Sequence, residues 1–331
     1  MYTRILRVLI IRVIMGVIMT VLTQLGLMRH VNAKSTAEIL GFSNTDRVLI
    51  IHADDIGMSH TVNRAALHLL QFGLVKSGSV MTPCPWANGV RTLLETIPEV
   101  DLGIHITLTS EWKNYKWSPL SGTMGLKDPK GYFWPTLSEA VQHASPEDIL
   151  KELEAQIAFA RKLGMNPSHI DSHMGVHFAK PDYLSGVVAL SKKYQIPAML
   201  VRWSPEFEIQ VRRYQLDPDP IREITNQAEK DGAVLLDYLV TSVPGKTFKE
   251  RKSSYDHFLK SLKPGVTQLI IHPGFLDDEM QGIMEEAPEG LYRRDADTRY
   301  FSSPETKNLI SKLGIKLIGW RDLLKVSRKK E

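Results

Sequence analysis

The sequence of 331 residues has a single cysteine, Cys84, and this scarcity excludes an intrachain disulfide. A chain of this length can bury a core large enough to fold without a disulfide, even in an oxidising compartment. Hydrophobic residues make up 43% of the sequence and charged residues 24%, which is ordinary globular composition. The composition therefore excludes a disordered chain and is compatible with one large α/β domain.

The chain also lacks an excess of charge outside its N-terminus. The formal net charge is +4, and residues 1–33 contain four arginines and no aspartate or glutamate. Residues 34–331 are therefore formally neutral. Because a neutral domain has no electrostatic reason to bind nucleic acid or an anionic membrane, we expect neither as a partner.

The first 33 residues have the layout of a secretory signal peptide. Arginines precede an apolar stretch at 13–28, and small or apolar residues occupy the two key positions before cleavage after Ala33. Thr20, Thr23 and Gln24 interrupt the stretch, which is also short for a spanning helix. We therefore predict a signal peptide at 1–33.

The signal peptide would make the mature protein secreted or periplasmic, with no stable membrane insertion after cleavage. Residues 34–331 would then form a single domain. The alternative is a protein anchored by an uncleaved N-terminal segment. A homo-oligomer is compatible with the sequence.

After the signal region, short apolar runs alternate with helical patterns, and no linker separates them. The apolar runs are Arg47 to His52, Gly78 to Thr82, Leu102 to Leu108, His169 to Asp171, Ala198 to Arg202, Val234 to Leu239, Gln268 to His272 and Lys316 to Gly319. The helix candidates are Thr61 to Phe72, Pro146 to Leu163, Tyr183 to Tyr194, Ile221 to Lys230, Phe248 to Leu262 and Pro304 to Leu313. This alternation predicts a distorted (β/α) barrel of the TIM type with mostly parallel strands; an open doubly wound sheet is the alternative.

Two long segments break the alternation. Glu111 to Ala144 is rich in aromatic residues, including Trp112 and Trp134, and Asp277 to Phe301 is a second, polar insertion. Each follows a predicted strand, so both would lie at the C-terminal face of a barrel, where active sites are built. Long loops in compact domains are often covers or binding loops.

Polar side chains that suit a metal site follow four of the apolar runs. They are Asp54 and Asp55, then His105, then Asp171 with His173 and His177, and finally His272. If the strands close into a barrel, these side chains converge on one rim. Asp oxygen and His nitrogen form the usual mixed ligand set of a hydrolytic metal site, so we predict one divalent metal ion.

A cation would also explain why two carboxylates stand side by side. One of them can bind the metal while the other stays free to take a proton from water. Each signal alone has a structural explanation: Asp54 and Asp55 could cap a helix, His105 could be a core histidine, and His272 a turn residue. Ser59 can cap the following helix by itself, and the four signals occur together, so the catalytic interpretation is favoured.

Four segments resemble the YdjC-like carbohydrate deacetylases, a family that includes chitooligosaccharide deacetylase and the hopanoid-associated deacetylase. They are Ala-Asp-Asp-Ile-Gly-Met-Ser, Leu-Gly-Ile-His-Ile-Thr-Leu-Thr, His-Ile-Asp-Ser-His-Met-Gly-Val-His and the late His-Pro-Gly. The resemblance extends in order from about Arg47 to Leu324. It implies metal-dependent removal of the acetyl group from an N-acetylated sugar on a distorted (β/α) barrel.

The resemblance also implies a role for each matching residue. Asp55, His105 and His173 would be the metal ligands, Asp54 the general base and His272 the general acid that protonates the departing amine. Family members commonly carry two further histidines after the one that matches His173, whereas this chain has Met and Gly there. The ligand is kept, but the hydrogen bonds around it and the substrate contacts are put in question.

The resemblance says less about which metal is bound and about the roles of the residues around the ligands. Two imidazoles and one carboxylate favour zinc, manganese or cobalt, whereas family descriptions often name magnesium. We hypothesise that Asp171 orients a ligand histidine or the attacking water, and that Arg202 holds Asp54 or substrate; the alternative for both residues is an ion pair on the surface or in the core. His177, Trp112 and Trp134 are further candidates for contacts with the site or with the sugar; alternatively, the aromatic residues of the insertion pack it onto the barrel as a small separate cluster.

Two other functions compete with deacetylation. Another metal-dependent amidohydrolase or a sugar isomerase could use the same barrel, although an isomerase would be expected to carry more carboxylates and often a lysine at the rim. A secreted carbohydrate-binding protein without catalysis would be expected to have a broken set of acid, base or ligands, and the set is intact.

Overall fold

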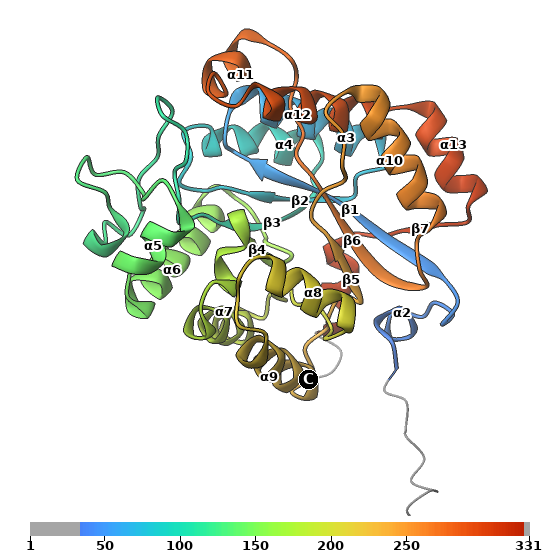
Figure 1. Ribbon diagram of the computed structural model, residues 1–331, viewed down its shortest axis with the longest axis horizontal. Coiled ribbons are helices and arrows are strands. Elements are labelled where there is room, and N and C mark those ends of the chain that lie inside the picture. The colour runs from blue at the N-terminus through green and yellow to red at the C-terminus, as the bar shows by residue number, and fades with distance from the viewer. Residues whose placement is uncertain (1–33, 328–331) are drawn as a thin grey trace, which may run out of the picture. The chain divides into compact units, whose positions relative to one another are not determined.

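A parallel β-sheet forms the centre of the protein, whose computed structural model describes residues 34–327 (Figure 1). The strands are β1 Arg47–Ile56, β2 Ser77–Val80, β3 Asp101–Ile106, β4 Ile170–Ser172, β5 Tyr238–Val240, β6 Gly265–Ile271 and β7 Lys316–Leu317. The strand order is β4-β3-β2-β1-β6-β5, and β7 pairs with β1. All of these pairings are parallel.

Two isolated parallel bridges continue the sheet from one end of this order to the other. Ile170 of β4 pairs with Ala198, and Val201 pairs with Leu236, just before β5. The strands therefore curl into a distorted barrel, which confirms the predicted fold class. The predicted strand at Ala198 to Arg202 is reduced to these two bridges.

Helices surround the sheet, as Figure 1 shows. They are α2 Thr36–Ile39, α3 His60–Phe72, α4 Val90–Thr96, α5 Leu137–His143, α6 Pro146–Lys162, α7 Pro181–Tyr194, α8 Pro205–Arg213, α9 Pro218–Lys230, α10 Phe248–Lys260, α11 Asp278–Ile283, α12 Pro288–Phe301, α13 Pro304–Lys312 and α14 Trp320–Ser327, with 3₁₀ turns η1 Ala87–Gly89, η2 Met124–Leu126 and η3 His173–Phe178. Ser59 caps α3 by accepting a hydrogen bond from the Val62 amide. The cap of α3 therefore does not need Asp54 or Asp55.

Strand β1 lies in the middle of the sheet and is almost completely buried. Nine of its ten residues are buried, and its neighbours on the two sides are β2 and β6. A strand covered on both faces reads as a continuous apolar run, as Val48 to Ile51 does. The polar residues that follow this run therefore enter an already buried environment.

The two insertions differ from each other. The segment from Glu111 to Ala144 is mostly irregular, with η2 and α5, and Tyr115 holds it to the chain after β1 by donating to the Met58 carbonyl at 2.6 Å. The second insertion, predicted as a polar loop, instead contains α11 and α12. This difference matters because α12 contributes two charged residues near the site.

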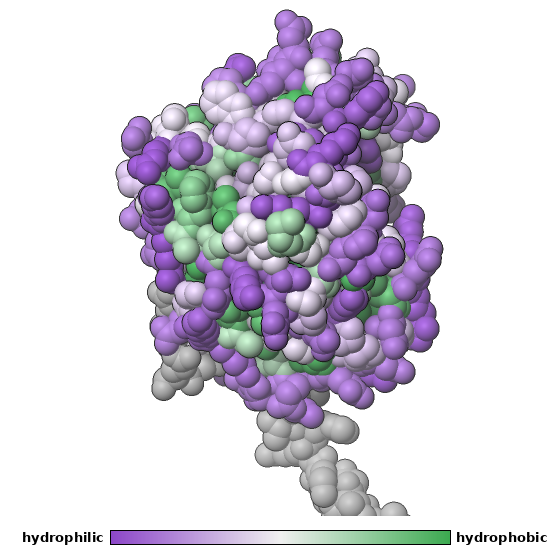
Figure 2. Space-filling view, turned by 90° about the vertical axis from the view of Figure 1, so that its left-hand side faces the viewer, coloured by the Kyte–Doolittle hydropathy of each residue, from purple (hydrophilic) through white to green (hydrophobic). Residues whose placement is uncertain are grey.

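The expected signal peptide lies outside the described residues. Within residues 34–327, no helix has the length and apolar character needed to cross a membrane. Hydrophilic residues cover most of the face in Figure 2, with smaller apolar areas between them.

Candidate metal centre and active site

A bulge at the end of β1 brings two adjacent carboxylates toward one imidazole. In a regular strand Asp54 and Asp55 would point to opposite faces. The register with β2 shifts between Ala53 and Ile56, and Asp55 has a left-handed φ of 66°. As a result, Asp54 Oδ2 lies 3.7 Å and Asp55 Oδ1 3.4 Å from Nε2 of His105. Bulges commonly re-aim side chains in this way next to active sites.

Asp55, His105 and His173 form a group whose ligand atoms lie within 4.8 Å of one another. All three residues are buried, and His173 Nδ1 lies 3.2 Å from Asp55 Oδ1. His105 Nε2 is buried and forms no hydrogen bond with any part of the described chain. An unpartnered buried nitrogen is costly unless something binds it, and one carboxylate with two imidazoles suits a divalent cation. The residues present therefore fit the metal that the sequence predicts.

Carboxylates hold the far side of both imidazoles. Asp171 Oδ1 lies 2.9 Å from His105 Nδ1, and Ser79 Oγ lies 3.0 Å from the same nitrogen. Glu111 Oε1 lies 3.0 Å from His173 Nε2. Metal-binding histidines usually donate their second N–H to such partners, which fixes the ring. The contact of Asp171 is the one its predicted orienting role requires, whereas Glu111 was not predicted as a site residue.

Arg294 of α12 was also not predicted. Its Nη2 atom lies 2.5 Å from Asp55 Oδ2, and both side chains are buried. Burial alone would raise the pKa of Asp55, but the charge of Arg294 and the nearby imidazoles of His105 and His173 hold it well below its usual range. Asp55 is therefore ionised in the folded protein.

The pKa values of the His105 and His173 imidazoles shift in the opposite direction, upward. Burial lowers the pKa of His105, but the nearby charges of Asp171 and Asp54 raise it well above its usual value. For His173, burial is likewise outweighed by Glu111 and Asp55, which raise the pKa to about 9. A cation that binds these nitrogens must displace their protons, so its binding would release protons.

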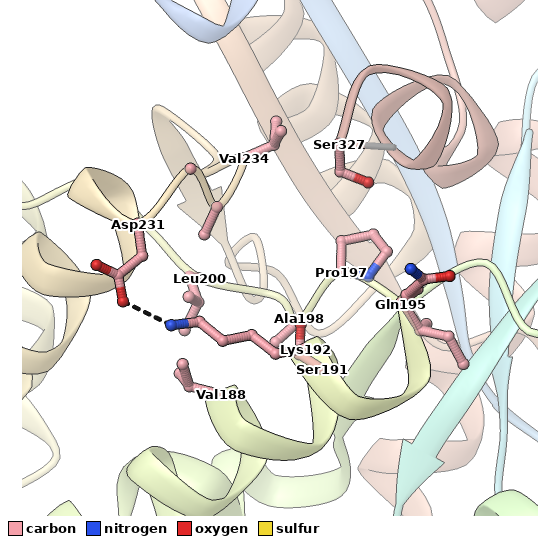
Figure 3. Close-up of a pocket in the computed structure, with 13 residues that line it drawn as sticks. Val188, Ser191, Lys192, Gln195, Pro197, Ala198, Leu200, Asp231, Val234 and Ser327 are labelled. Atoms are coloured by element: carbon pink, nitrogen blue, oxygen red, sulfur yellow. Dashed lines mark hydrogen bonds and ion pairs between the residues drawn. The ribbon is translucent and has the colours of Figure 1, made fainter. Parts of the chain in front are cut away.

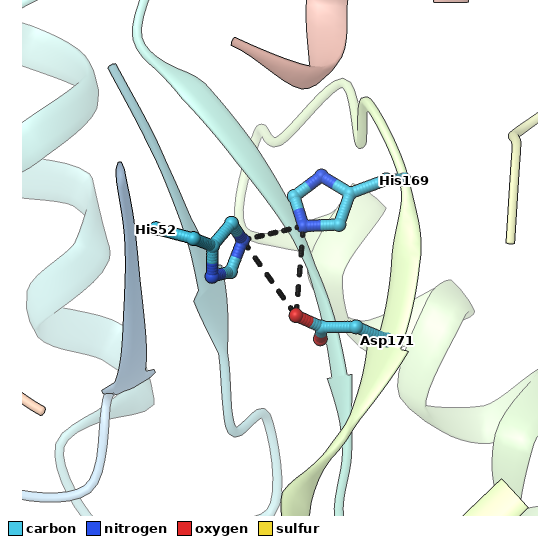
Figure 4. A group of neighbouring side chains, drawn as sticks. All are labelled: His52, His169 and Asp171. Atoms are coloured by element: carbon cyan, nitrogen blue, oxygen red, sulfur yellow. Dashed lines mark hydrogen bonds and ion pairs between the residues drawn. The ribbon is translucent and has the colours of Figure 1, made fainter. Parts of the chain in front are cut away.

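Asp54 belongs to a second buried network, drawn in part in Figure 4. Its Oδ1 atom lies 2.7 Å from His52 Nδ1, and His52 Nε2 lies 2.7 Å from His169 Nε2. Both histidines are completely buried, and Asp171 Oδ2 approaches their Nε2 atoms at 3.6 and 3.7 Å. In the sequence, His52 and His169 are only members of apolar runs, so their pairing could not be foreseen.

The main chain of His272 is held by Asp297 of α12. Asp297 Oδ2 accepts a hydrogen bond from the His272 amide at 3.1 Å. Its other oxygen, Oδ1, accepts from Arg251 and from the Tyr255 hydroxyl at 2.7 Å. Burial lowers the pKa of His272, against the opposing charges of Asp55 and Asp54. A lower pKa makes its imidazolium a stronger proton donor.

Arg202 forms the ion pairs that were the alternative to its hypothesised contact with Asp54. Its guanidinium group pairs with Asp237 and with Glu229, the latter at 2.8 Å, and not with Asp54. Asp237 directly precedes β5 and its amide bonds to Val266 near the start of β6. Arg202 therefore lies at the amino-terminal ends of these strands, whereas Asp54 is at the carboxyl end of β1.

Two further predicted site residues, His177 and Trp134, make contacts outside the metal group. His177 is buried, hydrogen-bonds to Ser172 and donates from Nε2 to the Met199 carbonyl at 3.2 Å. It does not share a helix face with His173, because the η3 turn is broken by positive φ angles at Met174 and Gly175. Trp134 stacks on His143 with ring centroids 4.0 Å apart and donates to the Gly125 carbonyl, so it packs within its own insertion.

Trp112 follows Glu111, whose carboxylate contacts His173 of the metal group. The two residues line a cleft between the two insertions. The other lining residues are Lys113, Asn114, Gly282, Ile283, Glu285, Glu286 and Ala287. This cleft adjoins the site because Glu111 also contacts His173.

A second hollow, shown in Figure 3, has different chemistry. It is lined by residues on both sides of an ion pair between Lys192 and Asp231, at 2.5 Å. The chain segments that line it, at 195–198 and 231–234, lead into the bridged residues of the barrel. It contains no group of carboxylates and imidazoles, and we assign it no role in the site.

Comparison with known proteins identifies the family. A family model described as YdjC-like protein matches residues 48–312. A carbohydrate deacetylase of Thermoanaerobacter pseudethanolicus is 30% identical over 243 residues, which cover 72% of this chain and 85% of the relative. A carbohydrate deacetylase of Thermus thermophilus is 39% identical over 150 residues, covering 45% of this chain and 52% of the relative, about half its length.

A solved structure shares the fold. It is a protein of Enterococcus faecalis for which cleavage of cellobiose phosphate has been suggested, with a TM-score of 0.65 and 24% identity. The match covers 84% of this chain and 99% of that one. The family match extends over most of the described residues and includes the metal group, Asp54 and His272. The chain therefore belongs to the YdjC-like protein family.

Proposed function

We propose that this protein is a metal-dependent deacetylase that removes the acetyl group from N-acetylated amino sugars. Relatives in its family are carbohydrate deacetylases. The observation that carries the proposal is the buried His105 Nε2 atom, which lacks a hydrogen-bond partner in the described chain and faces both Asp54 and Asp55. This arrangement supplies a metal ligand set and a separate base in one place.

Asp55, His105 and His173 would hold the cation. Magnesium or zinc would serve, and manganese or cobalt also suit this donor set. When bound, the cation would lower the pKa of a water molecule and polarise the acetamide carbonyl. Arg294 keeps Asp55 ionised and Asp171 and Glu111 hold the imidazoles, so the ligands would be positioned before the cation arrives.

Asp54 would act as the general base. Its Oδ1 atom is occupied by His52, which leaves Oδ2 directed at the side where His105 Nε2 lies. That oxygen can accept the proton of the water that attacks the acetyl carbon. Asp54 and Asp55 thus have separate roles because the bulge gives them different partners.

His272 would protonate the amine as it leaves. An amide nitrogen is a poor leaving group until it gains a proton, and histidine can donate one near neutral pH. The contact of Asp297 with the His272 amide fixes the main chain at this point. Because burial lowers the pKa of His272, its acid form is lost at a lower pH than for an ordinary histidine.

The cleft beside Glu111 and Trp112 would receive the sugar. It lies between the two insertions and adjoins the metal group. Trp112 offers the cleft one aromatic side chain, and the charged and polar residues around it could bind sugar hydroxyl groups. If the signal peptide at 1–33 is cleaved as we expect, deacetylation would occur outside the cytoplasm, and finding the full-length chain in the cytosol would contradict this placement.

Acetate release from N-acetylglucosamine and its oligomers tests the proposal. The chain is assayed as prepared, after metal removal and after metal is restored, beside Asp54→Asn. We expect release to require metal and kcat to fall about 10²- to 10⁴-fold in Asp54→Asn, since a general base contributes about that much. Asp182→Asn, an exposed aspartate in the first turn of α7, is the matched control and should keep its activity.

The outcomes separate the alternatives. Tight binding of one metal with no release from any acetylated sugar would favour another metal-assisted reaction on the same barrel. Neither metal binding nor release would favour a carbohydrate-binding protein. Full release from metal-free protein would contradict the proposed site.

A further inference from the structure

Behind Asp54, a line of hydrogen-bonding groups leads into the barrel core. We call Ser168, His169 and His52 the histidine line. Ser168 Oγ lies 2.8 Å from His169 Nδ1, the two Nε2 atoms of His169 and His52 lie 2.7 Å apart, and His52 Nδ1 lies 2.7 Å from Asp54 Oδ1. Both imidazole rings and Ser168 are 0% exposed.

The spacing fits hydrogen bonds better than a second metal ion. His52, His169 and Asp171 carry ligand atoms close enough to form a candidate metal group. Two nitrogens on a tetrahedral zinc ion would stand about 3.3 Å apart, given bonds of roughly 2.0 to 2.1 Å. The Nε2 atoms are 2.7 Å apart, which is a hydrogen-bond distance.

The carboxylate fixes the hydrogen at one end of the line. An ionised Asp54 can only accept, so His52 Nδ1 must carry the hydrogen that lies between them. With neutral rings every group is satisfied in one direction: the Ser168 hydroxyl donates to His169, His169 Nε2 donates to His52, and His52 donates to Asp54. A protonated His52 would donate from Nε2 to His169, and His169 would then donate from Nδ1 to Ser168, while the bond from His52 to Asp54 would stay unchanged.

The surroundings hold the His169 ring in a single position. The ring stacks on Trp320 with centroids 4.7 Å apart and an interplanar angle of 14°. On another side lies Gly103 of β3, where a Cβ atom would come within 2.4 Å of the His169 ring. Trp320 itself donates from Nε1 to Gln268 Oε1 at 2.8 Å. The site at position 103 therefore has room for the imidazole only because it has no side chain.

We propose that His52 is a positioning residue for Asp54, and that His169 holds His52 in the orientation this requires. The inference rests on the proposed function, in which Asp54 is the general base. By occupying Oδ1, His52 would fix the carboxylate plane and leave Oδ2 for the proton of the attacking water. His52 would contact neither the sugar nor the metal.

The first test does not depend on activity. Long-range ¹⁵N–¹H NMR spectra of protein labelled at the histidine ring nitrogens report which nitrogen carries hydrogen. Signals are assigned from their loss in His52→Asn and His169→Asn. We expect a protonated Nδ1 on His52 in wild type; a His52 ring protonated at Nε2 alone would overturn the proposal. Metal analysis of the holoenzyme should give one ion per chain, and a second ion lost on His169→Asn would also overturn it.

The second test compares two substitutions at one position. The side-chain amide of His52→Asn can place an N–H near Asp54 where Nδ1 stood, whereas His52→Leu provides none. We expect His52→Leu to lower kcat about 10- to 100-fold, the usual effect of losing such a supporting hydrogen bond, with KM and bound metal little changed. His52→Asn should recover much of that loss. His257→Leu, at an exposed histidine of α10, is the matched control.

A third variant acts from a distance. Gly103→Ala adds only a methyl group, but that group would displace the His169 ring. We expect kcat to fall while KM is kept and the His52 signals shift. Wild-type kcat in His52→Leu, or equal losses in the Leu and Asn variants, would overturn the proposal. If wild type itself released no acetate, the proposed function would fail, while the NMR spectra would still decide whether His52 donates to Asp54.

Discussion

Two buried ionic clusters meet at α12, and they differ in one respect. The Asp55 cluster consists of Asp55, His105, His173 and Arg294; the Asp297 cluster consists of Asp297, Arg251 and Tyr255. In the first, His105 Nε2 finds no hydrogen-bond partner among residues 34–327. In the second, both oxygens of Asp297 accept hydrogen bonds. Burial of charge is common to both, and the unfilled position distinguishes a binding site from a structural cluster.

The same helix serves both clusters. Arg294 and Asp297 are three residues apart in α12, so they lie on neighbouring turns of one face. One supplies a cation to Asp55 and the other an anion to Arg251. The position of the site therefore depends on α12, which the Asp297 cluster holds in place.

Removing a charge from the Asp297 cluster should have the largest effect on the free energy of unfolding. Asp297→Ala would leave the guanidinium group of Arg251, which is 3% exposed, without its carboxylate. Removing one partner of a buried pair typically costs about 3 to 5 kcal/mol of unfolding free energy. Urea unfolding measures the loss.

A double variant sharpens this prediction. Arg251→Met with Asp297→Leu removes both charges at once, and we expect it to regain most of the lost stability. A loss below about 1 kcal/mol in Asp297→Ala would show that the cluster is not the support we describe. Asp182→Asn on the surface of α7 serves as the control.

His177 provides a pH-dependent comparison, since it too is buried with its hydrogen bonds filled. Burial lowers its pKa from 6.5 to about 4. Between these values the unfolded chain binds a proton that the folded chain does not, so stability falls as pH drops from 6.5 to about 4. The shift corresponds to about 3 kcal/mol at most.

Unfolding of wild type and His177→Gln across this pH range measures the effect. The variant should lose this part of the pH dependence, because glutamine does not titrate. Parallel curves for the two proteins would contradict the prediction. A difference at neutral pH alone would report only the lost hydrogen bonds.

Changing the carboxylates that hold the imidazoles of the Asp55 cluster should have a smaller effect. That effect should appear in the affinity for the metal. Asp171→Asn keeps an oxygen near His105 Nδ1 but removes the charge. Losing such a partner commonly costs 10- to 100-fold in affinity, or about 1.4 to 2.7 kcal/mol. Competition with a chelator measures it, and unchanged affinity in both Asp171→Asn and Glu111→Gln would mean that the imidazoles need no support.

The smallest effect is expected at Ser79. Its hydroxyl lies 3.0 Å from His105 Nδ1, which Asp171 already approaches at 2.9 Å. Because the ring nitrogen has a single hydrogen to share, Ser79→Ala should change unfolding free energy and metal affinity by about 1 kcal/mol or less. A loss as large as that of Asp171→Asn would show that the serine, rather than the carboxylate, orients the ring.

The barrel could be predicted because buried parallel strands appear in the sequence as apolar runs, and because helix starts are marked by capping residues. Ser59 accepts the capping hydrogen bond predicted for it, and Ser145 and Ser303 accept such bonds at the starts of α6 and α13. The polar groups after four strands were recognised because parallel strands end at one rim. The structure brings Asp54, Asp55, His105 and His173 together there.

Other parts of the site leave no such pattern. The buried face of α12 includes Arg294, Asp297 and Thr298, so it lacks the apolar stripe by which a helix is recognised. His52 and His169 occupy strand positions where a core histidine is the ordinary interpretation. Glu111 could have been noticed as the first residue of a long insertion that follows a strand. Arg202 was misplaced because a strand's length, and hence its end, is hard to predict for a segment that forms only isolated bridges.

The left-handed backbone of Asp55 has a consequence for how the protein could change under selection. A φ of 66° suits glycine better than aspartate, at a cost to aspartate on the order of 1 kcal/mol. A glycine at this position would relax the bulge but would leave the buried Arg294 without its carboxylate, a loss that typically costs about 3 to 5 kcal/mol. Because this cost exceeds the backbone gain, Asp55 can be lost without harm to stability only if Arg294 is replaced as well, so a lineage that no longer needed the reaction would still tend to keep aspartate at position 55.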